Sequence, residues 1–214
     1  MYCTDTDLLR WEPTLFAEAA FASQTLLSAD CTLLGTTLTL SGGASFEASR
    51  VRAGHVATIT SSAAIGCYPI ISIDAATAGT ISILHEGLNA SPPLTAPVTG
   101  EAIATHVVVR TFSPQRQIVS ELLTWMSGIR PGTAARVMNA DVLRRPCALG
   151  TLHMIYNAMA AAATGDSADL IVRAELYERL YRRSLRSVVV ELDLDGDGRA
   201  DSQRALRLVQ FARV

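Results

Sequence analysis

The chain contains no lysine, and all 18 of its basic residues are arginine, against 20 acidic residues. The resulting net charge of -2 gives no bulk attraction to nucleic acid. No apolar run approaches the roughly 20 residues that a transmembrane helix requires. The start carries Asp5 and Asp7 where a secretory signal would carry basic residues. We therefore expect a protein that is made and kept in a cytoplasm, without a membrane partner.

The usual signatures of zinc sites and catalytic sites are also missing. The four cysteines form no CxxC pair, which favours reduced thiols: Cys3, Cys31, Cys67 and Cys147. The histidines show no HxH, HExxH or HxxxH spacing and are predicted to be structural: His55, His85, His106 and His153. There is also no GxSxG, Walker loop or GxGxxG, so an enzyme is not expected.

Cys147 follows Arg144 and Arg145 at the start of a predicted helix, a position that can lower a thiol pKa. Nothing in the sequence marks the partners that a nucleophile needs, so we predict a small residue that packs between helices. The alternative, a cysteine-dependent enzyme, would require His153 or another histidine within hydrogen-bond reach of Cys147.

What the chain does contain is 49% hydrophobic and 18% charged residues, the balance of a folded protein. Near the start, Thr4, Asp5 and Asp7 are candidate helix caps. Pro13 suits the first turn of a helix through LFAEAAFASQTLL, residues 15–27. Residues 1–30 are thus predicted to form an N-terminal helical segment.

Residues 31–112 are rich in β-branched residues and glycines, and apolar and polar residues alternate along them. The segments that predict strands are CTLLGTTLTL, SFEASRV, GHVATIT, CYPIISID, GTISIL and IATHVVVRTF. Five or six short strands are typical of a small barrel or sandwich, because closure hides their edges. A long loop at 85–101, rich in proline and glycine, interrupts them and is a candidate contact arm.

Residues 113–186 show helical periodicity and form the predicted helical core. Ser113 and Pro114 suit a helix start, and the apolar face of that helix ends before Gly128. This face consists of Ile118, Leu122, Trp125 and Met126. A second helix is predicted from Pro146 to a break at Thr164 and Gly165, and a third from a cap at Asp166 or Ser167 to about Arg186. A β-hairpin arm is predicted at 187–214. The fold class is therefore α+β, with a core of three to four helices and an inserted β domain.

The last predicted helix carries a charged face. Glu175 with Arg179 and Glu178 with Arg182 are spaced for ion pairs one turn apart. The arginines could also bind nucleic acid, but no aromatic residues interleave to stack on bases. We interpret the face as solvated or as an interface, made of Glu175, Glu178, Arg179, Arg182, Arg183 and Arg186.

The stretch DLDGDGRAD, residues 193–201, has the spacing of a calcium loop. Its oxygen donors would be Asp193, Asp195, Asp197, the carbonyl of Arg199, and Asp201. Arg204 stands where an EF-hand carries its glutamate, and the flanks read as strands, so an EF-hand is not expected. Two interpretations stay open: a Ca²⁺ loop between two strands, or a hairpin turn with solvated acids.

Four stretches resemble neck proteins of tailed bacteriophages and prophages, of the head-to-tail connector or adaptor class. They are MYCTDTDLLRWEPTLF, RAGHVATI with YPIISIDAATAGTISIL, RTFSPQRQIVSELLTWMSGI, and LYERLYRRSLRSVVVELDLDGDGRADSQRALRLVQFAR. The resemblance lies in the order of these segments and in the pattern of residue types along each of them, and it covers most of the chain. One departure is the large β domain, since connectors of this class are mainly helical.

The resemblance implies a structural virion protein without a reaction, located in the neck and assembled in the host bacterial cytoplasm. It would form a ring, usually twelvefold, that joins the portal protein to the stopper or tail-completion protein and lets genomic DNA pass through its lumen. The alternatives are a tail terminator, or a calcium-dependent binding or adhesion module. The aspartate loop would pin the C-terminal arm, through cations or through arginines of a neighbouring protein.

Overall fold

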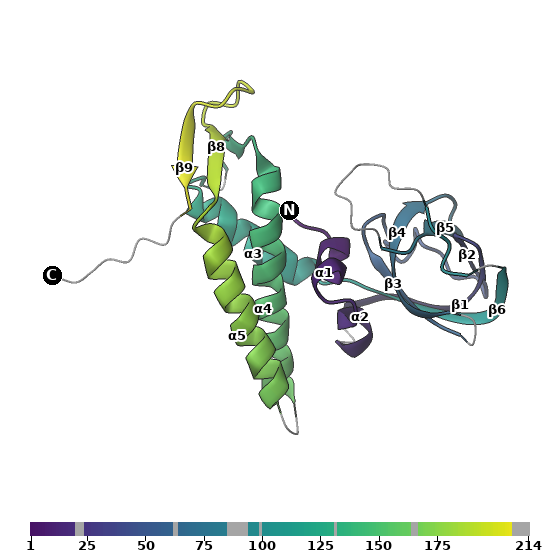
Figure 1. The fold of residues 1–214 in the computed structure, drawn as a ribbon. Coiled ribbons are helices and arrows are strands. Elements are labelled where there is room, and N and C mark those ends of the chain that lie inside the picture. The colour runs from purple at the N-terminus through teal and green to yellow at the C-terminus, as the bar shows by residue number, and fades with distance from the viewer. Residues whose placement is uncertain are drawn as a thin grey trace. The chain divides into compact units, whose positions relative to one another are not determined.

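The computed structural model describes residues 1–19, 24–61, 64–84, 94–98, 100–130, 132–163 and 167–206, and only the backbone of 101–104. The chain divides into two compact units. One unit comprises residues 5–112, and the other comprises residues 1–4 together with the chain from Ser113 onward. The described part is a mixture of five α-helices and a closed six-stranded antiparallel barrel (Figure 1). We call the two parts the barrel unit and the helical unit.

The barrel unit begins with two short helices, followed by the six strands of the barrel. The helices are α1 (Asp5–Trp11) and α2 (Leu15–Glu18). The strands are β1 (Thr25–Leu34), β2 (Thr37–Leu40), β3 (Val56–Thr60), β4 (Ile65–Ile73), β5 (Ala78–Ile81) and β6 (Glu101–Arg110). Their order around the barrel is β1-β2-β5-β4-β3-β6, with β6 pairing back onto β1. The predicted barrel or sandwich is therefore a barrel, in which no strand edge is left open.

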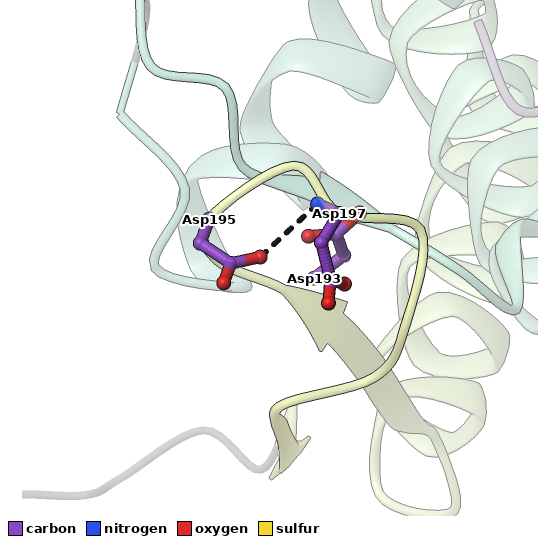
Figure 2. A group of neighbouring side chains, drawn as sticks. All are labelled: Asp193, Asp195 and Asp197. Atoms are coloured by element: carbon purple, nitrogen blue, oxygen red, sulfur yellow. Dashed lines mark hydrogen bonds between the residues drawn. The ribbon is translucent and has the colours of Figure 1, made fainter.

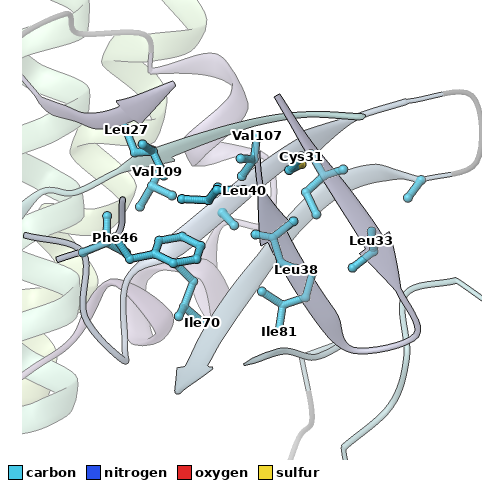
Figure 3. Close-up of a cluster of buried hydrophobic side chains, with 14 residues drawn as sticks. Leu27, Cys31, Leu33, Leu38, Leu40, Phe46, Ile70, Ile81, Val107 and Val109 are labelled. Atoms are coloured by element: carbon cyan, nitrogen blue, oxygen red, sulfur yellow. The ribbon is translucent and has the colours of Figure 1, made fainter. Parts of the chain in front are cut away.

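Alternating apolar residues fill the inside of this barrel. Along β2, Leu38 and Leu40 are buried while Thr37 and Thr39 face out, which is the period of two that a half-buried strand requires. Leu33 of β1 and Ile81 of β5 are fully buried (Figure 3). Ile59 of β3 is fully buried as well. So narrow a barrel is filled by its own side chains. Its interior is therefore a packed core.

The predicted helix over residues 15–27 is wrong in its second half. Among the described residues of this segment, Leu15–Glu18 is α-helical and β1 already begins at Thr25, while residues 20–23 lie outside the described part. Leu27 is buried in the barrel core and pairs with Val109 of β6. Pairing with β6 satisfies the backbone groups of this segment, and that tertiary contact overrides its local helix propensity.

The stretch SFEASRV, residues 45–51, is also not the predicted strand. Its backbone closes on itself in turns, with Ser49 N–H donating to the Ser45 carbonyl and Val51 N–H to the Phe46 carbonyl. Arg50 adopts a φ of 55°, a conformation that strands do not use. Phe46 and Val51 are nevertheless buried in the barrel core. The two apolar residues therefore fill the core from a connection between β2 and β3.

The helical unit contains three long helices, a 3-10 turn and a small sheet. The helices are α3 (Ser113–Met126), α4 (Arg144–Ala162) and α5 (Ala168–Leu185), with η2 (Ala140–Leu143) before α4. The sheet joins β7 (Arg136–Val137), β8 (Val189–Asp193) and β9 (Ser202–Ala205) in that order. The helices start and end within about two residues of the predicted positions, because their caps, prolines and periodicity are local signals.

Helix α4 packs against both α3 and α5. Residues 146–152 are buried on every side of the helix. At Gly150 a Cβ atom would lie 3.0 Å from a Val119 methyl of α3 and 3.2 Å from the Tyr181 ring of α5. The missing side chain thus lets both helices approach α4 closely at the same level. Tyr156 and Tyr177 stack with ring centroids 5.7 Å apart and add to the α4–α5 contact.

The predicted C-terminal hairpin exists, but it is built into the helical unit. β8 pairs with β9 on one side and with β7 on the other, so the hairpin belongs to a three-stranded sheet. Val190, Leu192 and Leu206 are buried. A hairpin that buries one face in its own unit is not a free arm. Residues 207–214, the remainder of the predicted arm, lie outside the described residues.

Candidate functional site

The aspartate loop connects β8 to β9, and Asp193 is its anchor (Figure 2). This residue ends β8 and is fully buried. Its Oδ1 accepts a hydrogen bond from Gly196 N–H at 2.6 Å, and its Oδ2 accepts one from Gly198 N–H at 2.9 Å. The Arg136 Nε of β7 donates to Oδ2 at 2.9 Å. One carboxylate thus closes the loop and ties it to the neighbouring strand.

These contacts keep Asp193 ionised. Burial by itself would raise its pKa, but the Gly196 and Gly198 N–H donors and the Arg136 guanidinium outweigh it and lower the pKa below its usual range. The two glycines have φ angles of 85° and 88°, which side-chain-bearing residues rarely adopt. The sequence D-x-x-G-x-G is therefore required by the backbone path as much as by the charge.

The other aspartates cap the loop from outside and are exposed. Asp195 Oδ1 accepts a hydrogen bond from Asp197 N–H at 3.1 Å, as Figure 2 shows. Asp197 Oδ1 accepts one from Arg199 N–H at 2.7 Å, and Asp201 Oδ2 accepts one from Leu194 N–H at 2.6 Å. Such bonds from aspartate to a nearby N–H are the ordinary way in which this residue stabilises turns.

Three of the predicted ligands come together closely enough to hold a metal ion. Oxygens of Asp193, Asp195 and Asp197 all lie within 4.8 Å of one another. Hard cations such as Ca²⁺ prefer carboxylate oxygens, usually six to eight in total. Asp193 already accepts three hydrogen bonds, so it has one acceptor position left to offer. The loop is thus held by hydrogen bonds and also presents an oxygen cluster for a cation.

The histidines take part in local contacts. His106 bridges Asp30 and Ser28 on the barrel surface, at 3.0 Å from each. His55 accepts a hydrogen bond from Arg52 N–H. His153 contacts the Ala174 carbonyl and Asn157. His85, like residues 86–93 and 99 of the predicted long loop, lies outside the described residues.

Cys147 is buried at the start of α4, as expected of a packing residue, but its closest partner is another cysteine. The Cys3 thiol donates to Cys147 Sγ at 2.8 Å, and Ser120 Oγ lies 3.4 Å away. His153, whose contacts are given above, does not form the Cys–His pair that the enzyme alternative requires. No sequence signal could have found the Cys3 contact, because 144 residues separate the two cysteines.

The charged face predicted on α5 lies on the surface. Arg179, Arg182, Arg183 and Arg186 are exposed together with Glu175, and Glu178 is half-buried. Arg182 and Glu178 form the predicted ion pair at 2.5 Å. Exposed pairs of this kind contribute little stability. They therefore leave the face available for other contacts.

Two rows of apolar residues also lie exposed on the helical unit, and sequence reasoning missed their exposure. On α3 they are Ile118, Leu122 and Trp125, with Trp125 69% exposed. On α5 they are Ile171, Val172 and Leu176, with Val172 61% exposed. The sequence located the α3 row as an apolar face. The helix, however, buries its other side, with Val119 and Leu123.

A comparison of this chain with protein-family models, curated proteins and solved structures finds no match. In the described residues, no helix is long and apolar enough to cross a membrane. The functional assignment therefore depends on the residues and on their arrangement.

Proposed function

We propose that this chain is a structural virion protein of a tailed bacteriophage, a head-to-tail connector of the neck. Copies of the helical unit associate head to tail into a ring, which in the resembled class is usually twelvefold. The ring joins the portal protein to the stopper or tail-completion protein, and genomic DNA passes through its lumen without sequence recognition. The protein assembles in the host cytoplasm and resides in the virion neck.

The observation that carries this proposal is the pair of unlike apolar rows on α3 and α5. A ring requires two different faces that complement each other, because each subunit contacts one neighbour with each face. Contiguous apolar residues on a surface mark interaction sites more often than isolated ones do. Two such rows on one unit therefore favour an assembly in which the α3 row of each copy contacts the α5 row of the next copy.

The charges beside the two apolar rows support the proposal that each row binds a second copy of this chain. The exposed side of α3 carries Glu121, while Arg116, the only basic residue of this helix, is buried. On α5, Val172, Leu176, Arg179 and Arg183 recur at helical spacing, so basic residues continue the apolar row. An apolar face with an acidic residue thus matches an apolar face with basic residues.

Light scattering on two single variants tests the head-to-tail arrangement. Leu122→Asp damages the α3 row and Val172→Asp damages the α5 row, and each variant alone should be monomeric because every contact requires both rows. Mixed together they should form heterodimers, since each variant retains the face that the other lacks. Ile65→Asp, at a 78% exposed position of the barrel, is the matched control and should leave the wild-type mass unchanged.

The same measurement is repeated with a purified portal ring, because a neck protein can require its partner before it assembles. A shift of the wild-type protein onto the portal, lost in Leu122→Asp, supports the proposal. A wild-type chain that stays monomeric at every concentration and ignores the portal ring would overturn it.

Ca²⁺ is the ion we assign to the aspartate loop. The support is the group of three carboxylates within 4.8 Å of one another and the oxygen chemistry that Ca²⁺ prefers. A cation there would neutralise Asp195 and Asp197, which lie exposed beside the β8–β9 hairpin. Its role would be to fix this hairpin where the ring meets a neighbouring neck protein.

A further inference from the structure

Residues 2–4 are fastened to the helical unit by hydrogen bonds from both sides of Cys3. Tyr2 N–H donates to Ser120 Oγ at 3.1 Å, and the Tyr2 hydroxyl lies 2.8 Å from Thr124 Oγ1. Arg116, buried in α3, donates to the Cys3 carbonyl at 2.9 Å. These contacts hold the backbone of Cys3 in place and fix the direction in which its side chain points.

In this orientation the Cys3 thiol contacts the sulfur atom of Cys147. The two sulfur atoms are 2.8 Å apart, and the residues are only 4% and 0% exposed. A disulfide needs sulfur atoms roughly 2.05 Å apart, so the sulfurs must approach each other by less than about 1 Å. Cys3 lies outside any helix or strand, so the approach does not require a shift of α4.

We propose that Cys3 and Cys147 form an oxidisable pair, a modification site at which a peroxide joins residues 1–4 covalently to α4. The proposal is independent of the ring and of the neck. It concerns the thiol chemistry of one unit.

Cys147 is the first sulfur to react. The hydrogen bond from Cys3, helped by those from Ser120 and from the backbone of Cys3 and Tyr2, lowers the pKa of Cys147 to about 7 against the opposing effect of burial, and the lowered pKa favours its thiolate. The thiolate attacks one oxygen of hydrogen peroxide, the O–O bond breaks, and the products are a sulfenic acid and hydroxide. Both thiols are buried, so the peroxide reaches them through local opening of the structure.

Cys3 completes the reaction. Its sulfur attacks the Cys147 sulfur, the S–O bond breaks, and hydroxide leaves with the Cys3 proton as water. In sum, two thiols and one peroxide give one disulfide and two water molecules, with two electrons passing from sulfur to oxygen. No further reactant is needed.

The other two cysteines provide an internal contrast. Burial, followed by the negative charge of Asp30, raises the pKa of Cys31 to about 11, and its thiol donates to the Thr105 carbonyl. Burial also raises the pKa of Cys67, whose sulfur lies 3.6 Å from Thr58 Oγ1. Both belong to the barrel unit, and their partners in these contacts are threonines.

A disulfide at this place would close a loop that contains the entire barrel unit. The chain passes between the two units twice, between residues 4 and 5 and between residues 112 and 113. The disulfide would hold the segment before the first of these crossings covalently on α4, in addition to the hydrogen bonds that Tyr2 and Cys3 make with α3. Closing a loop this long restricts the unfolded chain strongly.

The experiment treats the reduced wild-type protein with hydrogen peroxide, blocks the remaining thiols with a maleimide, and maps the peptides by mass spectrometry. We expect two of the four thiols to disappear and one linked peptide to contain Cys3 and Cys147. The oxidised protein should unfold at a temperature higher by roughly 5 to 10 °C, and dithiothreitol should reverse this shift. The wild-type map is meaningful even if a variant folds poorly.

Variants separate this pair from general oxidation. Cys3→Ser should abolish both the linked peptide and the thermal shift, whereas the double variant Cys31→Ser, Cys67→Ala should retain the linked peptide. Four thiols that survive peroxide treatment of the native protein would overturn the proposal. A linked peptide that joins other cysteines or two chains would overturn it as well.

Discussion

Exposed apolar residues are distributed differently on the barrel unit and on the helical unit. In the barrel these residues are scattered, with Leu34 at the end of β1 and Ile65 at the start of β4. In the helical unit they recur at helical spacing on α3 and again on α5. Single exposed apolar residues are normal for any protein surface, whereas rows of them mark contacts. The difference supports the proposal that copies of the chain associate through the helical unit.

The two units can be observed separately, because the chain has two tryptophans and each unit contains one. Trp11 lies in α1 of the barrel unit, and Trp125 lies in α3 of the helical unit. A Trp125→Phe background therefore reports the barrel, and a Trp11→Phe background reports the helices. This pair of backgrounds is the basis for the first two tests below.

The largest effect should come from emptying the barrel core. Phe46→Ala removes a fully buried ring and should lower the free energy of unfolding of the barrel unit by about 3–5 kcal/mol. Trp11 fluorescence during urea denaturation measures this loss. Leu34→Ala, at an exposed position of β1, is the control and should change the stability by less than about 0.5 kcal/mol. An equal loss in the Trp125 signal would show that the two units do not unfold separately.

The next effect concerns acid stability of the helical unit. The folded pKa of Asp193 lies below its unfolded value of 3.8, so its contribution to stability is fully present above that unfolded value and is lost as pH falls through the folded pKa. Asp193→Asn should lower stability at neutral pH and should flatten its decline below about pH 5. The measurement is the Trp125 unfolding midpoint between pH 3 and 7. Asp195→Asn, which removes an exposed carboxylate from the same loop, is the matched control.

A smaller effect should follow from Ca²⁺. Added Ca²⁺ should raise the unfolding temperature of the helical unit in a saturable way, corresponding to about 1–3 kcal/mol at 10 to 100 times its Kd. The double variant Asp195→Asn, Asp197→Asn should remove this rise and leave the Ca²⁺-free protein folded, because Asp193 still closes the loop. Equal stabilisation of wild type and double variant would contradict binding at the loop.

The smallest effect on stability is expected on the exposed row itself. Trp125→Ala should change the free energy of unfolding by less than about 0.5 kcal/mol, since the side chain is 69% exposed. It should nevertheless weaken self-association by tenfold or more, because aromatic residues dominate interface energies. Urea denaturation followed by circular dichroism and light scattering measure the two quantities. A large loss of monomer stability would show that Trp125 belongs to the folded core.

Local signals predicted the helical unit better than the start of the barrel. Ser113, Pro114 and Gly128 bound α3 in the sequence, and the structure has the helix between them. Residues 15–27 carried a helical signal as well, but pairing of β1 with β6 decided otherwise from Thr25 onward. A strand that completes a barrel gains contacts from distant residues, and no local pattern reports them.

The candidate site divides in the same way. The spacing of Asp193, Asp195 and Asp197 predicted a compact acidic loop, because aspartates and glycines determine a turn over a few residues. The contact of Asp193 with Arg136 and the contact of Cys3 with Cys147 join residues that are 57 and 144 positions apart. Such contacts depend on how the elements pack.

By itself, then, the sequence determined the elements whose signals lie within a few residues. These are the caps and helical periodicity of α3 and α5, the alternation of apolar and polar residues in the barrel strands, and the turn of the aspartate loop. Only the tertiary structure decided which apolar face of α3 is buried, that the hairpin joins β7, and that two distant cysteines meet. The physical reason is that caps and turns satisfy backbone groups locally, whereas burial is decided by whatever surface the rest of the chain supplies.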